Sequence, residues 1–376
     1  MPTPNALDLT QRLIRFDTIN PPGAERACLE HLAGLLAESG FETRLLDYDV
    51  PDRANLIARL PATEARRQPI AFTGHVDVVP LGQRDWSVPP FEGRVADGRV
   101  WGRGASDMKS GVAAFVAAAA GFAAEPARHA DILLIVTAGE ETGSEGAQHL
   151  ADKPGALEPC GALVVAEPTD GRPLVGHKGA LWLDVTVSGV TAHGSMPEKG
   201  VNAVVAAARL IERLTAFDFG VPPHPVMGAP TLNIGTISGG LNINSVPDRA
   251  VLGVDIRTIE GQRSAEVIDA LQALAGPEVR VAPRVVMESV FTDPAAPFIR
   301  TAFAVVERLT GKAPKVETAM YFTDASVLTR ALGNPPTLIL GPGPMAMAHQ
   351  TDEYCEIATL DRCVEAYRQI IADYLR

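Results

Sequence analysis

Cysteine is scarce in this sequence: four occur in 376 residues, at positions 28, 160, 355 and 363, and no two form a Cys-x-x-Cys pair. Neither a disulfide framework nor a thiolate zinc site is therefore expected. Basic residues are also few, with 33 Lys and Arg against 45 Asp and Glu, a net charge of −12. Because the basic residues are scattered and form no patch, the sequence predicts no nucleic-acid partner.

Long apolar runs are missing as well. The most apolar helical stretch, residues 111–124, is alanine-rich and too short to span a bilayer. Residues 1–8 show no basic segment leading into an apolar stretch, which a secretory signal would require. These absences predict a cytoplasmic protein without a membrane partner, in which residues 111–124 form a buried helix.

What is present is enough apolar material for a large core, since 46% of the residues are hydrophobic and 21% are charged. A chain of this length is expected to form two domains. Helical spacing of apolar residues predicts helices over 7–16 and 28–39, with Gly40 ending the second. Continuous apolar runs bounded by Gly or Pro are typical of strands buried on both faces, and they occupy residues 69–73, 132–137, 162–166 and 336–340.

The middle of the chain has a different pattern. Residues 181–187 alternate apolar and polar side chains, which indicates a strand with one wet face. Further strands are expected at 231–237, 249–258 and 279–287, and helices at 201–214 and 264–274. We therefore predict an α/β catalytic domain (1–176 and 289–376), with a central mixed sheet flanked by helices, and an inserted α+β domain (177–288) with two helices on one face of a mainly antiparallel sheet.

The first group of candidate residues lies in residues 73–77 (Thr-Gly-His-Val-Asp), where a predicted strand ends. Open α/β sheets place their sites beyond the carboxyl ends of strands. His75 can bind a metal there, with Asp77 fixing the orientation of its ring. Considered alone, His75 is better interpreted as a structural histidine, because His-x-Asp often occurs by chance.

Three carboxylates stand at comparable positions. Asp107 lies at the start of the alanine-rich helix and, considered alone, is best interpreted as an N-cap whose carboxylate accepts hydrogen bonds from the first turn. Glu140 and Glu141 follow the strongest predicted strand. Since adjacent side chains diverge, one can hold a metal while the other moves a proton. A pair of solvated surface acids is the alternative, and it fits poorly after a buried strand.

Two further candidates, Glu167 and His349, also follow predicted strands. Together the five segments supply two imidazoles and at least three carboxylates without cysteine, a mixture that suits zinc, manganese or cobalt. The number is sufficient for two metals. Two metals about 3.5–4 Å apart can polarise a carbonyl and ionise an attacking water, as amide hydrolysis requires.

These motifs, in this order over nearly the whole chain, resemble those of the co-catalytic zinc hydrolases. This family includes acetylornithine deacetylase, succinyl-diaminopimelate desuccinylase, aminoacylase and glutamate carboxypeptidase. The resemblance runs from residues 20–23 (Asn-Pro-Pro-Gly) to residues 349–354 (His-Gln-Thr-Asp-Glu-Tyr). It implies an enzyme with two Zn²⁺ ions, replaceable by Co²⁺ or Mn²⁺, that acts on a small N-acyl amino acid. It also implies that the inserted domain is a lid through which the chain forms a homodimer.

The resemblance further implies a role for each metal-site residue. Asp107 becomes the ligand that bridges the two metals, and Asp77 the residue that orients His75. Glu140 becomes the general base, which takes a proton from the attacking water and delivers it to the leaving nitrogen. The remaining four residues become ligands, with His75 and Glu167 on one metal and Glu141 and His349 on the other.

Four residues of the inserted domain acquire roles in the same way. His193 matches a histidine that reaches across a dimer to stabilise the oxyanion of the partner's substrate, whereas its spacing alone indicates a surface residue at a strand end. Asn244 and Arg257 match positions that hold a substrate carboxylate, which suits the planar fork of arginine. The alternative for Arg257 is a structural role, as a strand residue paired to an acid. Lys178 can neutralise a carboxylate as a point charge.

The identity of the acyl group is predicted from residues 177–180 (His-Lys-Gly-Ala). Desuccinylases carry Arg-Arg-Gly-Ser there, whereas the form seen here is similar to the acetylornithine deacetylases, so we predict N-acetylornithine deacetylation. Residues 320–323 (Met-Tyr-Phe-Thr) stand where relatives often have a Gly-Gly pair before the aspartate that matches Asp324, which leaves the substrate open. The alternatives are succinyl-diaminopimelate desuccinylation, a dipeptidase or carboxypeptidase, and a silent binding protein, which would be expected to have lost a ligand or the base.

Overall fold

The computed structural model describes residues 4–48 and 50–376, and these form two compact units. Of the described residues, unit 1 holds those up to Gly176 together with Phe291–Glu317 and Thr323–Arg376, and unit 2 holds His177–Val290 and Thr318–Phe322. The chain passes from one unit to the other at β8 (Gly176–His177), at β15 (Val290–Phe291) and on either side of residues 318–322.

One short segment lies in a different unit from the one that we predicted. Residues 318–322 were assigned to the catalytic domain, whereas the structure assigns them to unit 2. The reason is local contact: the Lys178 backbone N–H donates to the Ala319 carbonyl over 3.1 Å. The ring of Phe322 also meets that of Trp182 edge-on, with the centroids 6.2 Å apart.

Unit 1 is built on a six-stranded mixed sheet in the order β1-β2-β6-β3-β7-β16. β6, β3, β7 and β16 are parallel, whereas β1 and β2 run antiparallel to their neighbours. All residues of these four parallel strands are buried, which confirms the prediction drawn from their continuous apolar sequence. The strands are β1 (Glu42–Asp47), β2 (Ala54–Leu60), β3 (Ile70–His75), β6 (Ile132–Thr137), β7 (Ala162–Val165) and β16 (Thr337–Ile339).

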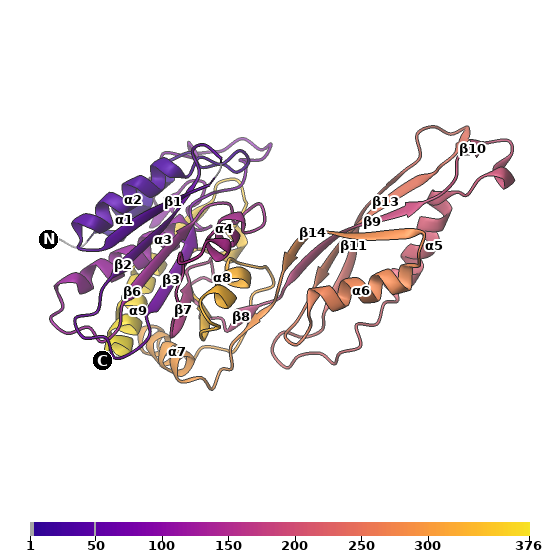
Figure 1. Ribbon diagram of the computed structural model, residues 1–376. Helices are drawn as coiled ribbons and strands as arrows, with labels where there is room; N and C mark the ends of the chain where they lie inside the picture. The colour runs from indigo at the N-terminus through magenta and orange to yellow at the C-terminus, as the bar shows by residue number, and fades with distance from the viewer. Residues whose placement is uncertain (1–3, 49) are drawn as a thin grey trace. The chain divides into compact units, whose positions relative to one another are not determined.

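Helices flank this sheet (Figure 1), so the predicted fold class is confirmed. α3 is buried along its whole length and contacts α1, α9 and β3, because its alanines and glycine allow close approach from every side. The predicted helix over 111–124 is an α-helix to Ala120 and a 3₁₀ turn from Gly121 to Ala124. The helices are α1 (Ala6–Ile14), α2 (Arg26–Glu38), α3 (Lys109–Ala120), α4 (Glu145–Asp152), α7 (Pro297–Thr310), α8 (Ala325–Ala331) and α9 (Ile357–Leu375).

A small second sheet in unit 1 fixes the position of the segment that precedes residue 354. It contains β4 (Arg94–Ala96), β5 (Arg99–Trp101) and β17 (Tyr354–Glu356) in the order β17-β5-β4. Tyr354 pairs with Trp101. The residues just before β17 are thereby held beside the residues just after β5.

Unit 2 is an antiparallel sheet in the order β11-β13-β9-β14, with α5 (Ala203–Thr215) and α6 (Ser264–Ala275) packed on one face. Leu181, Leu183, Val185 and Val187 of β9 are buried in this core, whereas the alternating Trp182 is partly exposed. The predicted period-two pattern is therefore confirmed. The strands are β9 (Ala180–Ser188), β11 (Thr231–Gly239), β13 (Arg249–Arg257) and β14 (Val279–Met287), with the short β10 (Ala192–His193) and β12 (Ser245–Val246).

Within residues 4–48 and 50–376, no helix combines the length and the apolar character that crossing a membrane requires. The cytoplasmic location and the lack of a nucleic-acid partner stay predictions.

Candidate metal centre

Parallel strand order brings the predicted ligands together. β6, β3, β7 and β16 are neighbours in the sheet of unit 1, so their carboxyl ends share one edge, where open α/β sheets place their sites. Each of these ends leads into at least one predicted ligand or the predicted base, and Asp107 joins them from the segment before α3. The residues that follow the strands are Glu140 and Glu141 (after β6), His75 (the last residue of β3), Glu167 (after β7) and His349 (after β16).

Asp107 lies between two imidazoles. Its Oδ1 is 3.2 Å from Nε2 of His75 and its Oδ2 is 3.5 Å from Nε2 of His349. His349 Nε2 is also 3.0 Å from Oε2 of Glu141, and His75 Nε2 is 3.9 Å from Oε1 of Glu167. The residues thus form two histidine–glutamate pairs that share one aspartate. Ligand atoms of His75, Asp107 and Glu141 lie within 4.8 Å of one another.

The tautomer of His75 shows that this arrangement fits a cation. His75 Nδ1 is 2.9 Å from the Asp77 carbonyl oxygen, which can only accept, so Nδ1 carries the proton. In the neutral ring, Nε2 then presents a lone pair to the carboxylate of Asp107. The buried Asp107 Oδ1 has no hydrogen-bond partner among the described residues. A metal ion between these two lone pairs would satisfy both.

The charge of the cluster points the same way. Burial raises the pKa of Glu140 and Glu167 well above the usual range. The charge of Glu167 raises the pKa of Glu140 further, and the charge of Asp107 raises that of Glu167. Burial alone would lower the pKa of His75, but the neighbouring carboxylates of Asp107 and Glu167 raise it well above its usual value. Buried carboxylates of this kind are stable when they coordinate metals. The donor set therefore fits two divalent cations.

Asp77 connects the His75 strand end to the loop of Glu140 and Glu141. The His75 ring is held mainly by the carbonyl of Asp77, because the carboxylate Oδ1 is farther away, at 3.5 Å. The carboxylate instead accepts the backbone N–H groups of Glu140 and Glu141, both over 3.2 Å. Asn20 Nδ2 donates to it over 3.0 Å. Asp77 therefore positions the loop of the predicted base as well as the imidazole.

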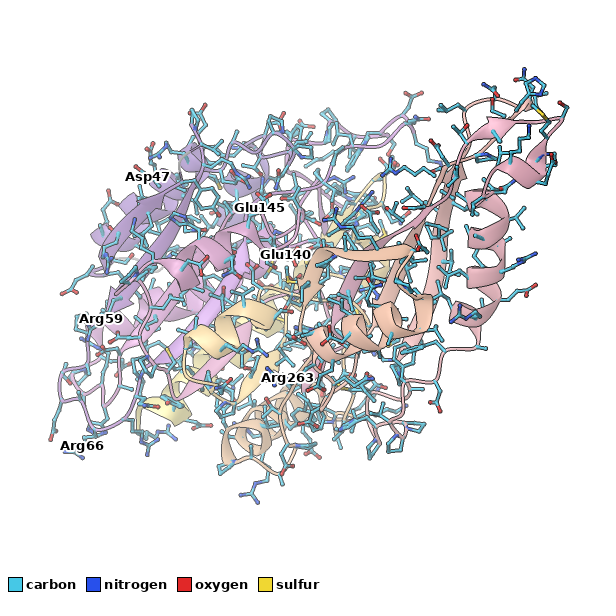
Figure 2. All side chains as sticks on the ribbon, turned by 45° about the vertical axis from the view of Figure 1, so that its right-hand side comes forward. Asp47, Arg59, Arg66, Glu140, Glu145 and Arg263 are labelled. Carbon is cyan, nitrogen blue, oxygen red and sulfur yellow. The ribbon has the colours of Figure 1, made fainter. Side chains whose placement is uncertain are left out.

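A buried arginine anchors the same loop from behind. Arg53 Nη1 is 2.7 Å from Glu145 Oε2, and Arg53 Nη2 is 3.2 Å from Oε1 of the buried Glu25. Gly139 has φ +74°, and a Cβ there would lie 2.4 Å from Arg53 Nη2, so the close approach requires glycine. Glu140 and Glu145 lie among the side chains of unit 1, whereas Asp47 and Arg66 lie at its periphery (Figure 2).

Asp107 is not an N-cap, so the interpretation favoured for it in isolation is wrong. The residue before α3 is Met108, and it makes no side-chain cap hydrogen bond. The Asp107 carboxylate faces the two imidazoles instead. α3 also packs closely against the strand end that carries Glu167. A Cβ on Gly111 would lie 2.1 Å from the Ala166 carbonyl oxygen.

The structure does not gather the unit 2 candidates into one group. His193 pairs with Ser245, and the Gly194 N–H donates to the Asn244 carbonyl over 2.7 Å, so His193 and Asn244 are close neighbours. Both side chains are exposed. His193 Nδ1 accepts from the backbone N–H of Ser195 over 3.2 Å. The neutral ring therefore has its proton on Nε2, where it can be donated.

Lys178 and Arg257 lie near the start of β9 and at the end of β13. Lys178 is buried, and its Nζ donates to the Ala229 carbonyl over 2.6 Å. Arg257 Nε is 3.1 Å from Asp255 Oδ1, an ion pair within its own strand. This contact is the structural alternative that the sequence left open. Both cations already have partners within unit 2, and their substrate roles stay predictions.

The sequence patterns did not indicate several buried contacts around the metal centre. Thr137 Oγ1 donates to Asp324 Oδ2 over 2.5 Å at the end of β6, and Arg103 and Glu353 form a buried ion pair. Each of these contacts joins segments far apart in the chain, so no local pattern indicated them. The one feature of the sequence that could have pointed to these residues is that they lie inside or beside the motifs that carry the family resemblance.

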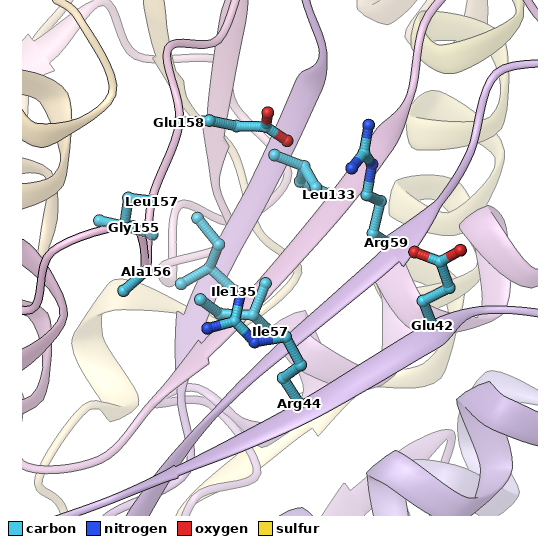
Figure 3. A pocket seen from close by; sticks show the side chains of 10 residues that line it. All are labelled: Glu42, Arg44, Ile57, Arg59, Leu133, Ile135, Gly155, Ala156, Leu157 and Glu158. Atoms are coloured by element: carbon cyan, nitrogen blue, oxygen red, sulfur yellow. The ribbon is translucent and has the colours of Figure 1, made fainter.

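A separate hollow of about 250 Å³ in unit 1 lies over β1, β2 and β6 (Figure 3). Its floor is apolar, from Ile57, Leu133 and Ile135, and Arg44 and Glu158 line its sides. None of the predicted site residues, all of which the structure describes, lines it. The candidate chemistry therefore lies elsewhere in the unit.

Comparison with known proteins agrees with this geometry. The family described as Peptidase family M20/M25/M40 matches residues 71–373. A succinyl-diaminopimelate desuccinylase from Paracoccus denitrificans is 33% identical over 99% of this chain and 99% of its own length. An acetylornithine deacetylase from Proteus mirabilis is 30% identical over 99% of this chain and 97% of its own. The predicted closer likeness to acetylornithine deacetylases is therefore not supported.

Solved structures show the same fold. An M20 family metallo-carboxypeptidase from Sulfolobus solfataricus superposes with a TM-score of 0.82, covering 98% of each chain at 17% sequence identity. At that sequence identity the structural similarity establishes the fold and does not identify the substrate.

Proposed function

Since this chain belongs to peptidase family M20/M25/M40 and is a metal-dependent hydrolase, we propose that it hydrolyses the amide bond of a small N-acyl amino acid at a two-metal centre. The observation that carries the proposal is the position of Asp107, whose two oxygens face the imidazoles of two separate histidine–glutamate pairs. This is the arrangement expected of a ligand shared by two metals.

Zinc is the proposed metal, with cobalt or manganese as substitutes, because imidazole and carboxylate ligands without thiolate suit these ions. His75, Glu167, Glu141 and His349 would hold the pair, and Asp107 would bridge it. A bound pair of divalent cations would polarise the scissile carbonyl and lower the pKa of the attacking water.

Glu140 is the proposed general base. Its backbone N–H is fixed by Asp77, and its carboxylate Oε2 lies 4.0 Å from His75 Nε2, inside the cluster. It would take a proton from the water as the oxygen attacks the acyl carbon. As the C–N bond breaks, it would deliver that proton to the leaving nitrogen, releasing a carboxylate and an amine.

His193 is the proposed oxyanion donor, supplied by a partner subunit. It lies beyond one end of β9, whereas Lys178 and Arg257 lie at the other end. β9 has nine residues, so at about 3.3 Å per residue the strand between the two groups is roughly 26 Å long. A small substrate cannot touch both within one copy of unit 2 (Figure 1), which supports action across a dimer.

Exposed apolar side chains support the proposed homodimer. β11 is an edge strand of the unit 2 sheet and carries the exposed Ile237, and Leu241 and Ile243 in the following loop are fully exposed. An unpaired edge beside exposed apolar residues is typical of a surface that is covered by another chain. A second copy of unit 2 would cover it.

Replacing His193 with alanine is expected to lower kcat by about 10²–10³-fold, the usual effect of losing one oxyanion donor. Zinc content should stay unchanged because the metal candidates lie in unit 1. Steady-state kinetics and metal analysis of the same preparation test this. An unchanged kcat would remove His193 from the reaction.

Mixed dimers distinguish action across the dimer from action within one chain. A dimer of one His193→Ala chain and one Glu140→Gln chain has one site with both its own Glu140 and the partner subunit's His193 if the histidine crosses over. Mixing the two inactive variants should then restore part of the activity. If His193 serves its own chain, neither site is complete and the mixture stays inactive.

N-succinyl-diaminopimelate is the first substrate that we propose. A desuccinylase matches this chain at 33% identity and an acetylornithine deacetylase at 30%, both over 99% of it. The prediction of an acetyl group relied on residues 177–180, but His177 and Lys178 are buried and bonded within unit 2. Structural contacts therefore account for these residues, so they carry little information about the acyl group.

The proposed function is tested by measuring hydrolysis of N-succinyl-diaminopimelate, N-acetylornithine, other N-acyl amino acids and dipeptides by zinc-loaded protein. We expect chelator-sensitive release of the free amine, fastest from the succinyl substrate. Faster deacetylation would keep the mechanism and change the substrate. Cleavage of dipeptides alone would replace deacylation with peptidase activity.

A further inference from the structure

Glu353 is a fully buried carboxylate whose contacts all lie on the loop that carries Asp107. Its Oε1 accepts the backbone N–H groups of Ser106 over 2.7 Å and of Asp107 over 2.9 Å. Its Oε2 accepts the Gly104 N–H over 2.9 Å and Nη1 of Arg103 over 2.7 Å. One side chain therefore fixes the backbone of residues 103–107, including the peptide N–H of Asp107 itself.

Arg103 connects this hydrogen-bonded group, Glu353 with residues 103–107, to two other loops of the site. Its Nη1 also donates to the carbonyl of Gln350, the residue after His349, over 3.2 Å, and its Nη2 donates to the Pro80 carbonyl over 3.1 Å. The Pro80 loop continues the chain from His75 and Asp77. The Arg103–Glu353 pair thus lies where the segments of Asp107, His349 and His75 meet.

The hydrogen bonds that residues 103–107 donate to Glu353 require the charged carboxylate form of this side chain. All four hydrogen bonds to Glu353 come from donors, so none of these partners could accept a proton from a protonated carboxyl group. Hydrogen bonds between a charged acceptor and buried donors are among the strong ones in proteins. Removing the charge leaves buried donors unpaired.

We propose that Glu353 is a positioning residue that, with Arg103, holds the metal-bridging carboxylate of Asp107 and the neighbouring His349 in place for the metal pair. The inference rests on the proposed function in that Asp107 and His349 are taken as ligands. It assigns to Glu353 control of metal affinity without direct contact with the metals.

The test is the Glu353→Gln variant. The amide keeps the size of the side chain but offers one acceptor oxygen in place of two, and its NH₂ group faces donors. Zinc affinity, measured by competition with a chromophoric chelator, should fall about 10–100-fold, the usual effect of losing a group that orients a ligand. With saturating zinc, kcat should fall while KM changes less, because the substrate does not touch Glu353.

Asp131→Asn is the matched control. Asp131 is also buried and accepts Nε of Arg59 and the backbone N–H of Ala62, both over 2.7 Å, but it directly precedes β6 at the opposite end of that strand from the site. This substitution is expected to lower the unfolding temperature without changing zinc affinity. A merely structural role of Glu353 would make the two variants behave alike.

If Glu353→Gln does not fold, Glu353→Asp retains the charge but retracts it by one methylene, and a weaker zinc affinity is again expected. A folded variant with wild-type zinc affinity and kcat would overturn the inference. This outcome differs from failure of the proposed function, in which the wild-type protein would bind zinc and yet hydrolyse no N-acyl substrate.

Discussion

Replacing Glu140 with glutamine is expected to lower kcat by about 10²–10⁴-fold, the range that a general acid–base residue supplies. The amide has the shape of the carboxylate but cannot take a proton from the attacking water. Zinc content should stay near that of the wild-type protein, because Glu140 is proposed as the base and the five other residues as the metal ligands. Stopped-assay kinetics on the best substrate of the panel, with metal analysis of the same sample, measure both quantities.

Glu158→Gln is the matched control for this substitution. Glu158 is an exposed carboxylate of unit 1 that lines the hollow over β1, β2 and β6, so its loss should leave kcat within about twofold of wild type, as expected for a surface substitution. An active Glu140→Gln protein would refute the assignment of the base. A Glu140→Gln protein without zinc would instead make Glu140 a ligand.

Replacing Asp107 with alanine is expected to have a comparably large effect through metal loss. Both oxygens that face the imidazoles disappear, so neither metal keeps its shared ligand. Because bound metals supply several kcal/mol of transition-state stabilisation, kcat/KM should fall by about three orders of magnitude or more. Zinc bound per chain should fall below the wild-type value.

Thermal unfolding separates this metal loss from misfolding. A ligand that binds the folded state at about a thousand times its Kd stabilises it by about 4 kcal/mol, so zinc should raise the Tm of the stripped wild-type protein. The same zinc should leave the Tm of Asp107→Ala almost unchanged. An equal rise in both proteins would show that Asp107 does not hold metal. Asp152→Asn, a change at an exposed residue of α4, should respond as wild type.

The parts of this site that follow from sequence depend on the order of parallel strands. Continuous apolar runs predicted β3, β6, β7 and β16, and residues placed just after such strands meet at one sheet edge. The convergence of His75, Glu140, Glu141, Glu167 and His349 could therefore be expected before any coordinates.

Asp107 and Glu353 show why the rest could not be predicted. An aspartate before a helix is locally as good a cap as a ligand, and only its contacts with His75 and His349, which are distant in sequence, decide between them. The bond from Arg103 to Glu353 joins positions 250 residues apart, and no periodicity encodes such a contact. The same is true of residues 318–322, which join unit 2 through Ala319 and Phe322.

We propose that a pair of metals held around Asp107 is necessary for amide hydrolysis. The most direct measurement is the activity of chelator-stripped protein as zinc is added in known equivalents. We predict that stripped protein is inactive and that activity rises to a plateau at two zinc ions per chain. The proposal would be wrong if the stripped protein were fully active, or if activity reached its plateau while the protein bound no zinc.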